Sequence, residues 1–162
     1  MIKTVTYIII VLKRKTTAFG REKRNHIMKK NTSRGITTIA TSKAPAAIGP
    51  YSQGRKGGNL LFVSGQLGTV PETGEFAGED LESQAVQSME NVKAIIEKAG
   101  LTMDDVLKTT CFITDMNNFA AFNEIYGRYF KQFPARSCVE VSKLPKGGLI
   151  EVEAVAYGKK RR

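Results

Sequence analysis

The sequence predicts an α+β protein in which two helices pack on one face of a mixed β-sheet. Segments with the composition of strands alternate with two segments of helical periodicity, in the order β, β, α, β, α, β, β. The last two strand segments alternate apolar and polar residues, which is typical of a sheet covered on one face only. The chain has 162 residues, of which 41% are hydrophobic and 25% charged, as expected of one soluble globular domain.

Five segments have the β-branched and apolar composition of strands. They are Thr37–Ala40, Asn59–Gln66, Val106–Thr114, Arg136–Val141 and Leu149–Tyr157. In the last segment one face is apolar and the other carries two glutamates: Ile150, Val152, Ala154 and Ala156 against Glu151 and Glu153. Before the second strand, Ala44–Gly54 contains two prolines and two glycines and predicts an ordered loop.

Two segments have the periodicity of amphipathic helices. In the first, apolar residues recur every three or four positions: Leu81, Ala85, Met89, Val92, Ile96 and Ala99. Gly100 follows at the position of a glycine that ends a helix. In the second, Asn118 is a candidate N-cap, and the apolar stripe consists of Phe119, Phe122, Tyr126 and Tyr129.

The basic charge of the chain is concentrated near its start. Residues 1–37 hold ten basic residues and one acidic residue, whereas the other residues hold 15 basic and 14 acidic ones. Positive charge confined to a terminal segment does not predict a nucleic-acid-binding domain, so nucleic acid is not an expected partner. We divide the chain into a basic extension, residues 1–35, and a folded domain, residues 36–158.

The extension has two interpretations. Few acids and many Lys, Arg and Thr residues resemble the composition of an organelle transit peptide, which predicts a mitochondrion or plastid. Alternatively Met28 is the true start, and the protein is cytoplasmic. The apolar run Val5–Leu12 is much shorter than the about 20 residues that span a bilayer, so no membrane segment is predicted.

Histidine and cysteine usage excludes several kinds of site. The one histidine, His26, lies in the extension, so the domain cannot form a histidine-based triad or a histidine-rich zinc site. The two cysteines, Cys111 and Cys138, form no CxxC motif and do not predict a disulfide framework. A reduced compartment is therefore expected.

Three residues are candidates for a catalytic or binding role because of their type and position in the sequence. Arg136 follows Pro134 at the start of a strand, where a guanidinium can bind a carboxylate; a surface salt bridge is the alternative. Glu151 lies within an apolar alternation, where its pKa can rise and it can hold or deprotonate water; a solvent-facing glutamate is the alternative. Tyr51 follows Pro50 in a stiff loop, which either lines a site or only packs as a turn.

Five motifs together are similar to one known family. They are Ala44–Gln53 (APAAIGPYSQ), Ser64–Gln66 (SGQ), Pro134–Val141 (PARSCVEV), Leu144–Pro145 and Ile150–Ala156 (IEVEAVA). In this order they resemble the RidA/YjgF reactive-intermediate deaminases over residues 38–156. The resemblance implies a chorismate-mutase-like fold, a homotrimer with sites between subunits, and no metal or organic cofactor. It also implies hydrolysis of 2-iminobutanoate and 2-iminopropanoate, small imino acids, to 2-keto acids and ammonia.

The resemblance also implies roles for individual residues. Arg136 is expected to bind the substrate carboxylate, and Glu151 to position the attacking water. The substrate-binding residues are expected to be Tyr51, Ser64, Gly65, Asn123 and Cys138, the last through its backbone. The Cys138 thiol is not expected to be a nucleophile, because no partner base is evident.

One geometric expectation concerns the two catalytic candidates. If Arg136–Val141 and Leu149–Tyr157 formed a plain hairpin, Arg136 and Glu151 would be about 13 Å apart along the strands, too far for one small substrate. We therefore expect that these strands are not immediate neighbours in simple register, or that subunit packing brings the two groups together.

Two other functions remain open at this point. One is a ribonuclease that inhibits translation, an activity that the family resemblance also implies; the near-neutral charge of the domain and its lack of histidine count against it. The other is a non-catalytic trimer that binds small ligands or has a chaperone-like role.

Overall fold

Six strands form one mixed sheet in the computed structural model, which describes residues 35–158. The strands are β1 (Ile36–Ile39), β2 (Gly54–Gly57), β3 (Leu60–Leu67), β4 (Val106–Ile113), β5 (Ala135–Glu140) and β6 (Ile150–Tyr157). Their order is β1-β2-β3-β6-β4-β5; β4 and β5 are parallel, and all other neighbours are antiparallel.

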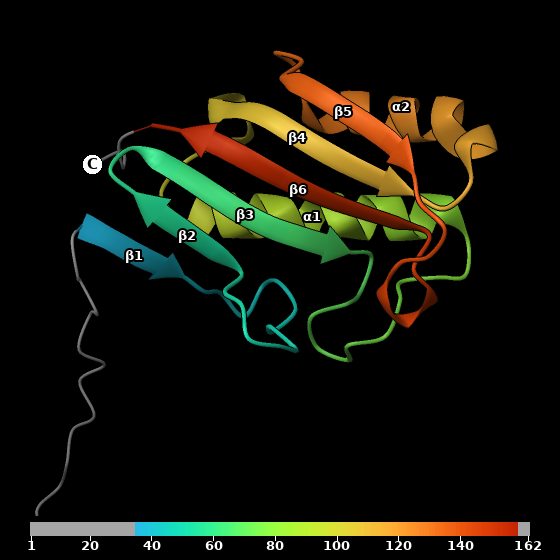
Figure 1. The fold of residues 1–162 in the computed structure, drawn as a ribbon, viewed down its shortest axis with the longest axis horizontal. Helices are drawn as coiled ribbons and strands as arrows, with labels where there is room; N and C mark the ends of the chain where they lie inside the picture. Colours follow the sequence, from blue (N-terminus) through green and yellow to red (C-terminus); the bar gives the residue numbers. More distant parts are fainter. Residues whose placement is uncertain (1–34, 159–162) are drawn as a thin grey trace, which may run out of the picture.

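Two α-helices, α1 (Leu81–Lys98) and α2 (Phe119–Tyr129), cover the same face of this sheet (Figure 1). The predicted α+β architecture is therefore confirmed. The predictions about residues 1–34 lie outside the described residues. Within 35–158, no helix has the length and apolar character needed to cross a bilayer.

One strand was not predicted. β2, with the sequence GRKG, continues the loop that precedes it and pairs with both β1 and β3. Its polar, glycine-flanked sequence lacks an apolar alternation, so its strand conformation comes from its neighbours. Gly58, at φ 58°, provides the left-handed conformation that a two-residue hairpin turn to β3 requires.

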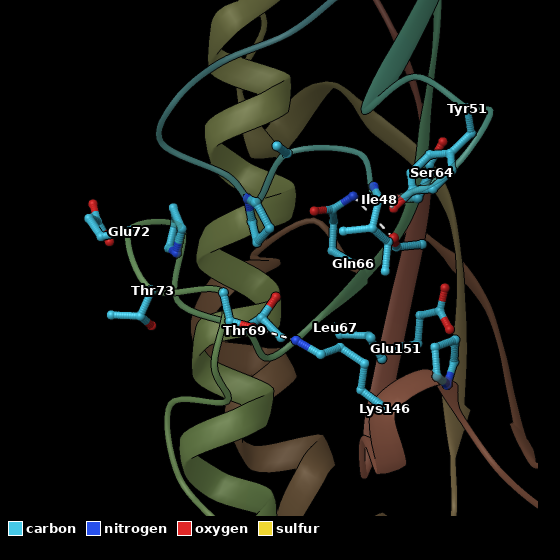
Figure 2. Close-up of a pocket in the computed structure, with 16 residues that line it drawn as sticks. Ile48, Tyr51, Ser64, Gln66, Leu67, Thr69, Glu72, Thr73, Lys146 and Glu151 are labelled. Atoms are coloured by element: carbon cyan, nitrogen blue, oxygen red, sulfur yellow. Dashed lines mark hydrogen bonds between the residues drawn. The ribbon is translucent and has the colours of Figure 1, made fainter.

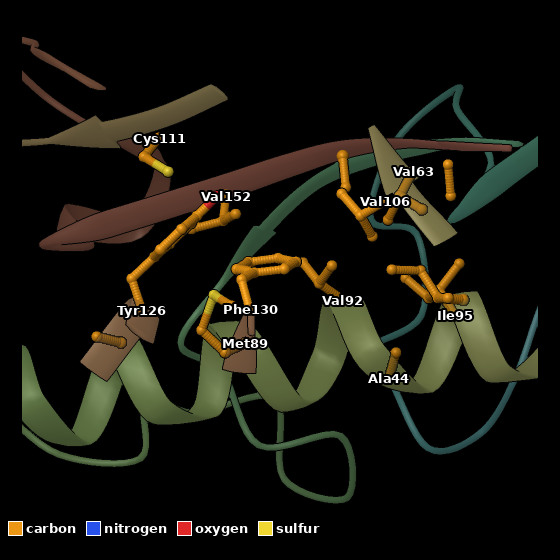
Figure 3. Packing of buried hydrophobic residues seen from close by; sticks show 14 of the residues in the cluster. Ala44, Val63, Met89, Val92, Ile95, Val106, Cys111, Tyr126, Phe130 and Val152 are labelled. Atoms are coloured by element: carbon orange, nitrogen blue, oxygen red, sulfur yellow. The ribbon is translucent and has the colours of Figure 1, made fainter. Parts of the chain in front are cut away.

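The core lies between the sheet and α1. All six residues of the predicted apolar stripe of this helix are buried. Figure 3 shows Met89, Val92 and Ile95 facing the sheet side chains of Val63 and Val152. Gly100, at φ 78°, follows the C-cap Ala99, as the sequence predicts.

The second helix differs from its prediction at its start. Asn118 occupies the N-cap position, but its side chain makes no cap hydrogen bond. The cap hydrogen bond lies one turn earlier, where Asp115 accepts from the backbone N–H of Asn117 at 2.9 Å and starts a short 3₁₀ turn. Phe122 and Tyr126 are buried as predicted, whereas Phe119 remains exposed.

The two strands that carry Arg136 and Glu151 are not neighbours. β4 lies between β5 and β6, so Thr109 pairs with Arg136 on one side and with Ala154 on the other. The expectation that no plain hairpin forms is therefore confirmed.

Candidate active site

A cavity of about 570 Å³ lies at the end of β3 and the start of β6. Four of the predicted site residues line it: Tyr51, Ser64, Gly65 and Glu151. Figure 2 shows Ser64 and Glu151 on neighbouring strands beside this space, with Lys146 on another side. The predicted motifs around Tyr51, Ser64 and Glu151 therefore meet at one place.

A β-bulge shapes the wall of this cavity. Val63 pairs with Ala154, and Gln66 pairs with Val152. Two residues of β3, Ser64 and Gly65, therefore lie opposite a single residue of β6, Glu153. Such a bulge redirects the side chains beside it. The Ser64 hydroxyl donates to the Ser52 carbonyl at 2.7 Å, which connects the bulge to the loop that carries Tyr51.

The carboxylate of Glu151 lies against Gly65. A Cβ at Gly65 would overlap a carboxylate oxygen of Glu151, so only glycine leaves room for this side chain position. Burial raises the pKa of Glu151, and the nearby carboxylate of Glu153 raises it further. Within residues 35–158 no cation forms a salt bridge with Glu151. Such a carboxylate is suited to exchanging a proton with water.

The loop before β2 is held by Gln53, which sequence reasoning missed. The Gln53 amide donates to the carbonyls of Thr41, Ala44 and Pro45, and its oxygen accepts from the Thr41 N–H. The side chain is only 5% exposed. The sequence shows that Gln53 ends the APAAIGPYSQ motif, but it does not show the four hydrogen bonds that its side chain forms with the backbone.

The opposite rim of the cavity carries another missed residue. Lys146 has a φ of 58°, which is uncommon for a residue other than glycine. Its ammonium group donates to the Gly74 carbonyl at 2.7 Å and so connects two loops that border the cavity.

The other three predicted site residues lie elsewhere in the chain. Arg136 is on β5, an edge strand, and donates to the Asn123 side chain at 2.7 Å. Its guanidinium lies 4.6 Å from the centre of the Tyr126 ring and 5.5 Å from that of Phe119. No carboxylate among the described residues forms a salt bridge with Arg136. Its fork of donors is therefore held in place and open to an anion.

Cys138 lies two residues after Arg136 and opposite Cys111 on β4. Burial raises the pKa of the Cys138 thiol, and it raises that of Cys111 to about 12. Both thiols are therefore protonated near neutral pH and are poor nucleophiles. This agrees with a backbone role for Cys138, and it leaves Arg136 and Asn123 as the polar side chains of this region.

The two groups of residues do not meet within one chain. Arg136 points to the helix-covered face, where it contacts α2. The neighbours of Glu151 in β6, Ile150 and Val152, are buried under the helices, so the Glu151 side chain points to the opposite face. The register places Arg136 and Glu151 about 14 Å apart across the sheet. A site that uses both therefore needs a second copy of the chain.

Within residues 35–158, no group of three or more His, Cys, Asp or Glu side chains could hold a metal ion. The cavity offers the carboxylates of Glu151 and Glu72, the ammonium group of Lys146, hydroxyl groups and main-chain groups. These groups can orient water and a small polar molecule.

The chain is similar to known proteins over most of its length. The family model described as endoribonuclease L-PSP matches residues 41–158. A RutC family protein of Haemophilus influenzae is 57% identical over 126 residues, which are 75% of this chain and 96% of that protein. A protein of Escherichia coli named 2-iminobutanoate/2-iminopropanoate deaminase is 54% identical over 123 residues, which are 74% of this chain and 95% of that protein.

A solved structure has the same fold. The crystal structure of the YjgF gene product from E. coli superposes with a TM-score of 0.73 and 51% identity, over 76% of this chain and 99% of that chain. Because the family model covers most of the chain and the relatives are more than half identical, the chain belongs to the RidA/YjgF family, whose family model carries the description endoribonuclease L-PSP.

Proposed function

We propose that the protein hydrolyses small 2-imino acids, such as 2-iminobutanoate and 2-iminopropanoate, to 2-keto acids and ammonia. The observation that carries this proposal is the 54% identity, over 95% of its length, to a protein named for this activity. The motifs that hold Tyr51, Ser64, Arg136 and Glu151 support it, because they supply an anion-binding group and a water-binding group without a metal.

The active site in this proposal is shared between copies of the chain, in a homotrimer as the family resemblance implies. Two features support sharing. Arg136 lies on an edge strand, where a second copy can reach it. The sheet face without helices exposes apolar side chains, including Phe62 at 52% and Val139 at 43%, which are suited to burial against another copy.

The reaction follows from the charges at the two half-sites. Arg136 binds the substrate carboxylate through two parallel hydrogen bonds, with Asn123 and the aromatic rings of α2 holding the guanidinium plane. Tyr51, Ser64 and the Gly65 N–H surround the reacting carbon. Cys138 contributes its backbone to substrate orientation.

Glu151 acts first as a general base and then as a general acid in this reaction. It accepts a proton from water as the water oxygen bonds to C2 of the protonated imine, and the C=N electron pair moves to nitrogen. The resulting carbinolamine has a neutral amine. Glu151 then returns the proton to this amine, the C–N bond breaks, and the hydroxyl group becomes the carbonyl of the keto acid as its proton leaves with ammonia. Placing the two reactants together removes several kcal/mol from such a barrier.

The test is a coupled assay that generates 2-iminobutanoate in solution and follows 2-oxobutanoate. The full chain should accelerate its formation, and Arg136→Ala should abolish the acceleration. A wild-type protein that binds 2-oxobutanoate but leaves the rate unchanged would instead indicate the non-catalytic ligand-binding role.

The family description favours one second candidate, an endoribonuclease. Cleavage of RNA needs a general base near a phosphate site. The cavity offers Glu151 as a base, but its lining contains two carboxylates, Glu72 and Glu151, against one ammonium group, Lys146, which disfavours phosphate. RNA cleavage that persists in Arg136→Ala, and disappears when residues 1–35 are deleted, would support this candidate over the deaminase.

A further inference from the structure

Helix α1 carries a row of buried polar residues on the side nearest the cavity. Gln84, Ser88 and Asn91, which we call the α1 polar stripe, are spaced four and three positions apart and therefore share one helix face. All three are buried, and Ser88 and Asn91 are fully so. Buried polar side chains of this kind need hydrogen-bond partners.

Ser88 and Asn91 donate to main chain that borders the cavity, and the Asn91 side-chain oxygen accepts from the Gln87 amide at 2.9 Å. The Ser88 hydroxyl donates to the Gln66 carbonyl at 2.8 Å. The Asn91 amide donates to the carbonyls of Leu67 and Thr69, at 3.0 and 2.9 Å. The stripe therefore holds the end of β3, directly after the Ser64–Gly65 bulge.

These hydrogen bonds replace those that β3 would form with β2 if β2 were longer. The pairing of β2 with β3 stops at Val63, so the following part of β3 has no strand on that side. Backbone groups that lose a strand partner inside a protein must find another. The helix side chains supply these hydrogen bonds in place of a strand.

Gln84 connects the same helix to the start of β6. Its side-chain oxygen accepts from the Leu149 N–H at 2.9 Å, and its amide donates to the Gly78 carbonyl at 2.9 Å. Leu149 is two residues before Glu151. Gly68 also packs directly on the backbone of Gln84, with no room for a Cβ.

The stripe thus holds both strands that meet at the Gly65–Glu151 contact. A Cβ at Gly65 would overlap the Glu151 carboxylate, so the two strands lie close together here and a shift of either one changes where the carboxylate lies. We propose that Gln84, Ser88 and Asn91 are positioning residues, which fix the Glu151 carboxylate beside Gly65 through the main chain of β3 and β6. The residues themselves do not touch the substrate.

The kinetic test rests on the proposed function and uses Gln84→Met and Ser88→Ala in the full chain. Both remove hydrogen bonds to the main chain with little change in the space that the side chain fills. We expect kcat to fall about tenfold with little change in KM, because misplacement of a reacting group by a fraction of an ångström slows the chemical step.

Val92→Ala is the matched control. Val92 is fully buried on the same helix but packs in the apolar core. It should lower the midpoint of thermal unfolding at least as much as Ser88→Ala does, with kcat unchanged. If Val92→Ala reduces kcat as much as Ser88→Ala does, or if Ser88→Ala and Gln84→Met keep full kcat, the positioning role is wrong. Ser88→Ala alone decides the matter if Gln84→Met does not fold.

A second readout does not depend on activity. The pKa of Glu151 can be followed by NMR of its ¹³C-labelled carboxyl group. The other ionisable groups beside it, Glu153, Glu72, Tyr51 and Lys146, are unchanged in these variants. In Ser88→Ala the pKa should move down toward the ordinary value as water reaches the carboxylate; in Val92→Ala it should not move. An unmoved pKa in Ser88→Ala overturns the positioning role even if the protein proves not to be a deaminase, whereas an inactive wild type with a shifted pKa contradicts only the proposed function.

Discussion

Arg136 and Glu151 point to opposite faces of one sheet, with β4 between the strands that carry them. Arg136 contacts α2 on the helix-covered face, and Glu151 lines a cavity that α2 does not reach. No side-chain rotation can bring the two groups to one small substrate. If two copies of the chain share each active site, as proposed, variants of these two residues should behave in a way that a site within one chain would not allow.

The first prediction is complementation between two inactive variants. Arg136→Ala keeps Glu151, and Glu151→Gln keeps Arg136, so a mixed trimer contains some sites with both groups. Random assembly of equal amounts should restore about a quarter of the wild-type activity, because each site takes one residue from each of two copies. The measurement is 2-iminobutanoate hydrolysis after the two variants are unfolded and refolded together.

The control for complementation is the double variant, Arg136→Ala with Glu151→Gln, refolded with either single variant. It should restore nothing, because one essential group is then missing from every site. Separately refolded single variants that are mixed afterwards should also stay inactive. A mixture that never regains activity, although mixed trimers are detected by mass, would contradict the shared site.

The second prediction concerns the close contact of Gly65 with Glu151. Gly65→Ala places a methyl group where a carboxylate oxygen lies, so the carboxylate must move. We expect kcat to fall about 10- to 100-fold, since the base no longer meets the water. Gly127→Ala is the matched control: Gly127 is inside α2 with open space around it, so alanine should raise the free energy of unfolding by about 0.5–1 kcal/mol and leave kcat unchanged. Equal kcat values for the two variants would show that the contact is unimportant.

The third prediction is a pH dependence set by Glu151. Glu151 acts as a base only when it is ionised, so kcat should fall as the pH drops through its raised pKa, at a pH above the ordinary glutamate value of about 4.3. Glu153→Gln removes a negative neighbour and should move this acidic limb to lower pH. Glu97→Gln, on the exposed surface of α1, should leave the limb where it is. If Glu153→Gln does not move the acidic limb, a group other than Glu151 causes it.

The same raised pKa fixes the sign of a stability effect. A carboxyl group whose pKa is higher in the folded state favours folding below its ordinary pKa and loses that contribution as the pH rises through the folded value. Glu151→Gln should therefore be at least as stable as the wild type at neutral pH, and the difference should vanish below about pH 4. Urea unfolding midpoints at both pH values measure this. A wild type that is clearly more stable than Glu151→Gln at neutral pH would contradict the desolvated carboxylate.

The helices and five of the six strands could be predicted because their patterns are local. The apolar stripe of α1 is a repeat of three and four residues, and β6 alternates along its whole length. β2 could not, because GRKG becomes a strand only through its pairing with β1 and β3. The same limit applies to the α1 polar stripe: polar residues on a helix are ordinarily exposed, and only the end of β2 makes them necessary inside.

The members of the site could be predicted from motifs, but their arrangement could not. Tyr51, Ser64 and Glu151 do share a cavity, although they come from a loop and two strands. That Arg136 and Glu151 lie on opposite faces depends on the insertion of β4 between β5 and β6 and on the register of each pair. Register across a sheet is a long-range property, and a slip by one residue reverses every side chain.

The last prediction concerns Gln53, whose side chain forms four hydrogen bonds with the backbone of residues 41–45. Gln53→Ala leaves these groups without partners, and each buried group without one costs about 1–3 kcal/mol, so the free energy of unfolding should fall by about 2–3 kcal/mol. KM should rise as well, because the loop carries Tyr51. Gln53→Glu has nearly the same shape but faces three carbonyls with a carboxylate, so it should lose as much as Gln53→Ala. Gln132→Ala, at an exposed position, should change neither value. Urea unfolding and the deaminase assay measure both, and a Gln53→Glu variant as stable as the wild type would mean that side-chain volume, not the three donated hydrogen bonds, holds the loop.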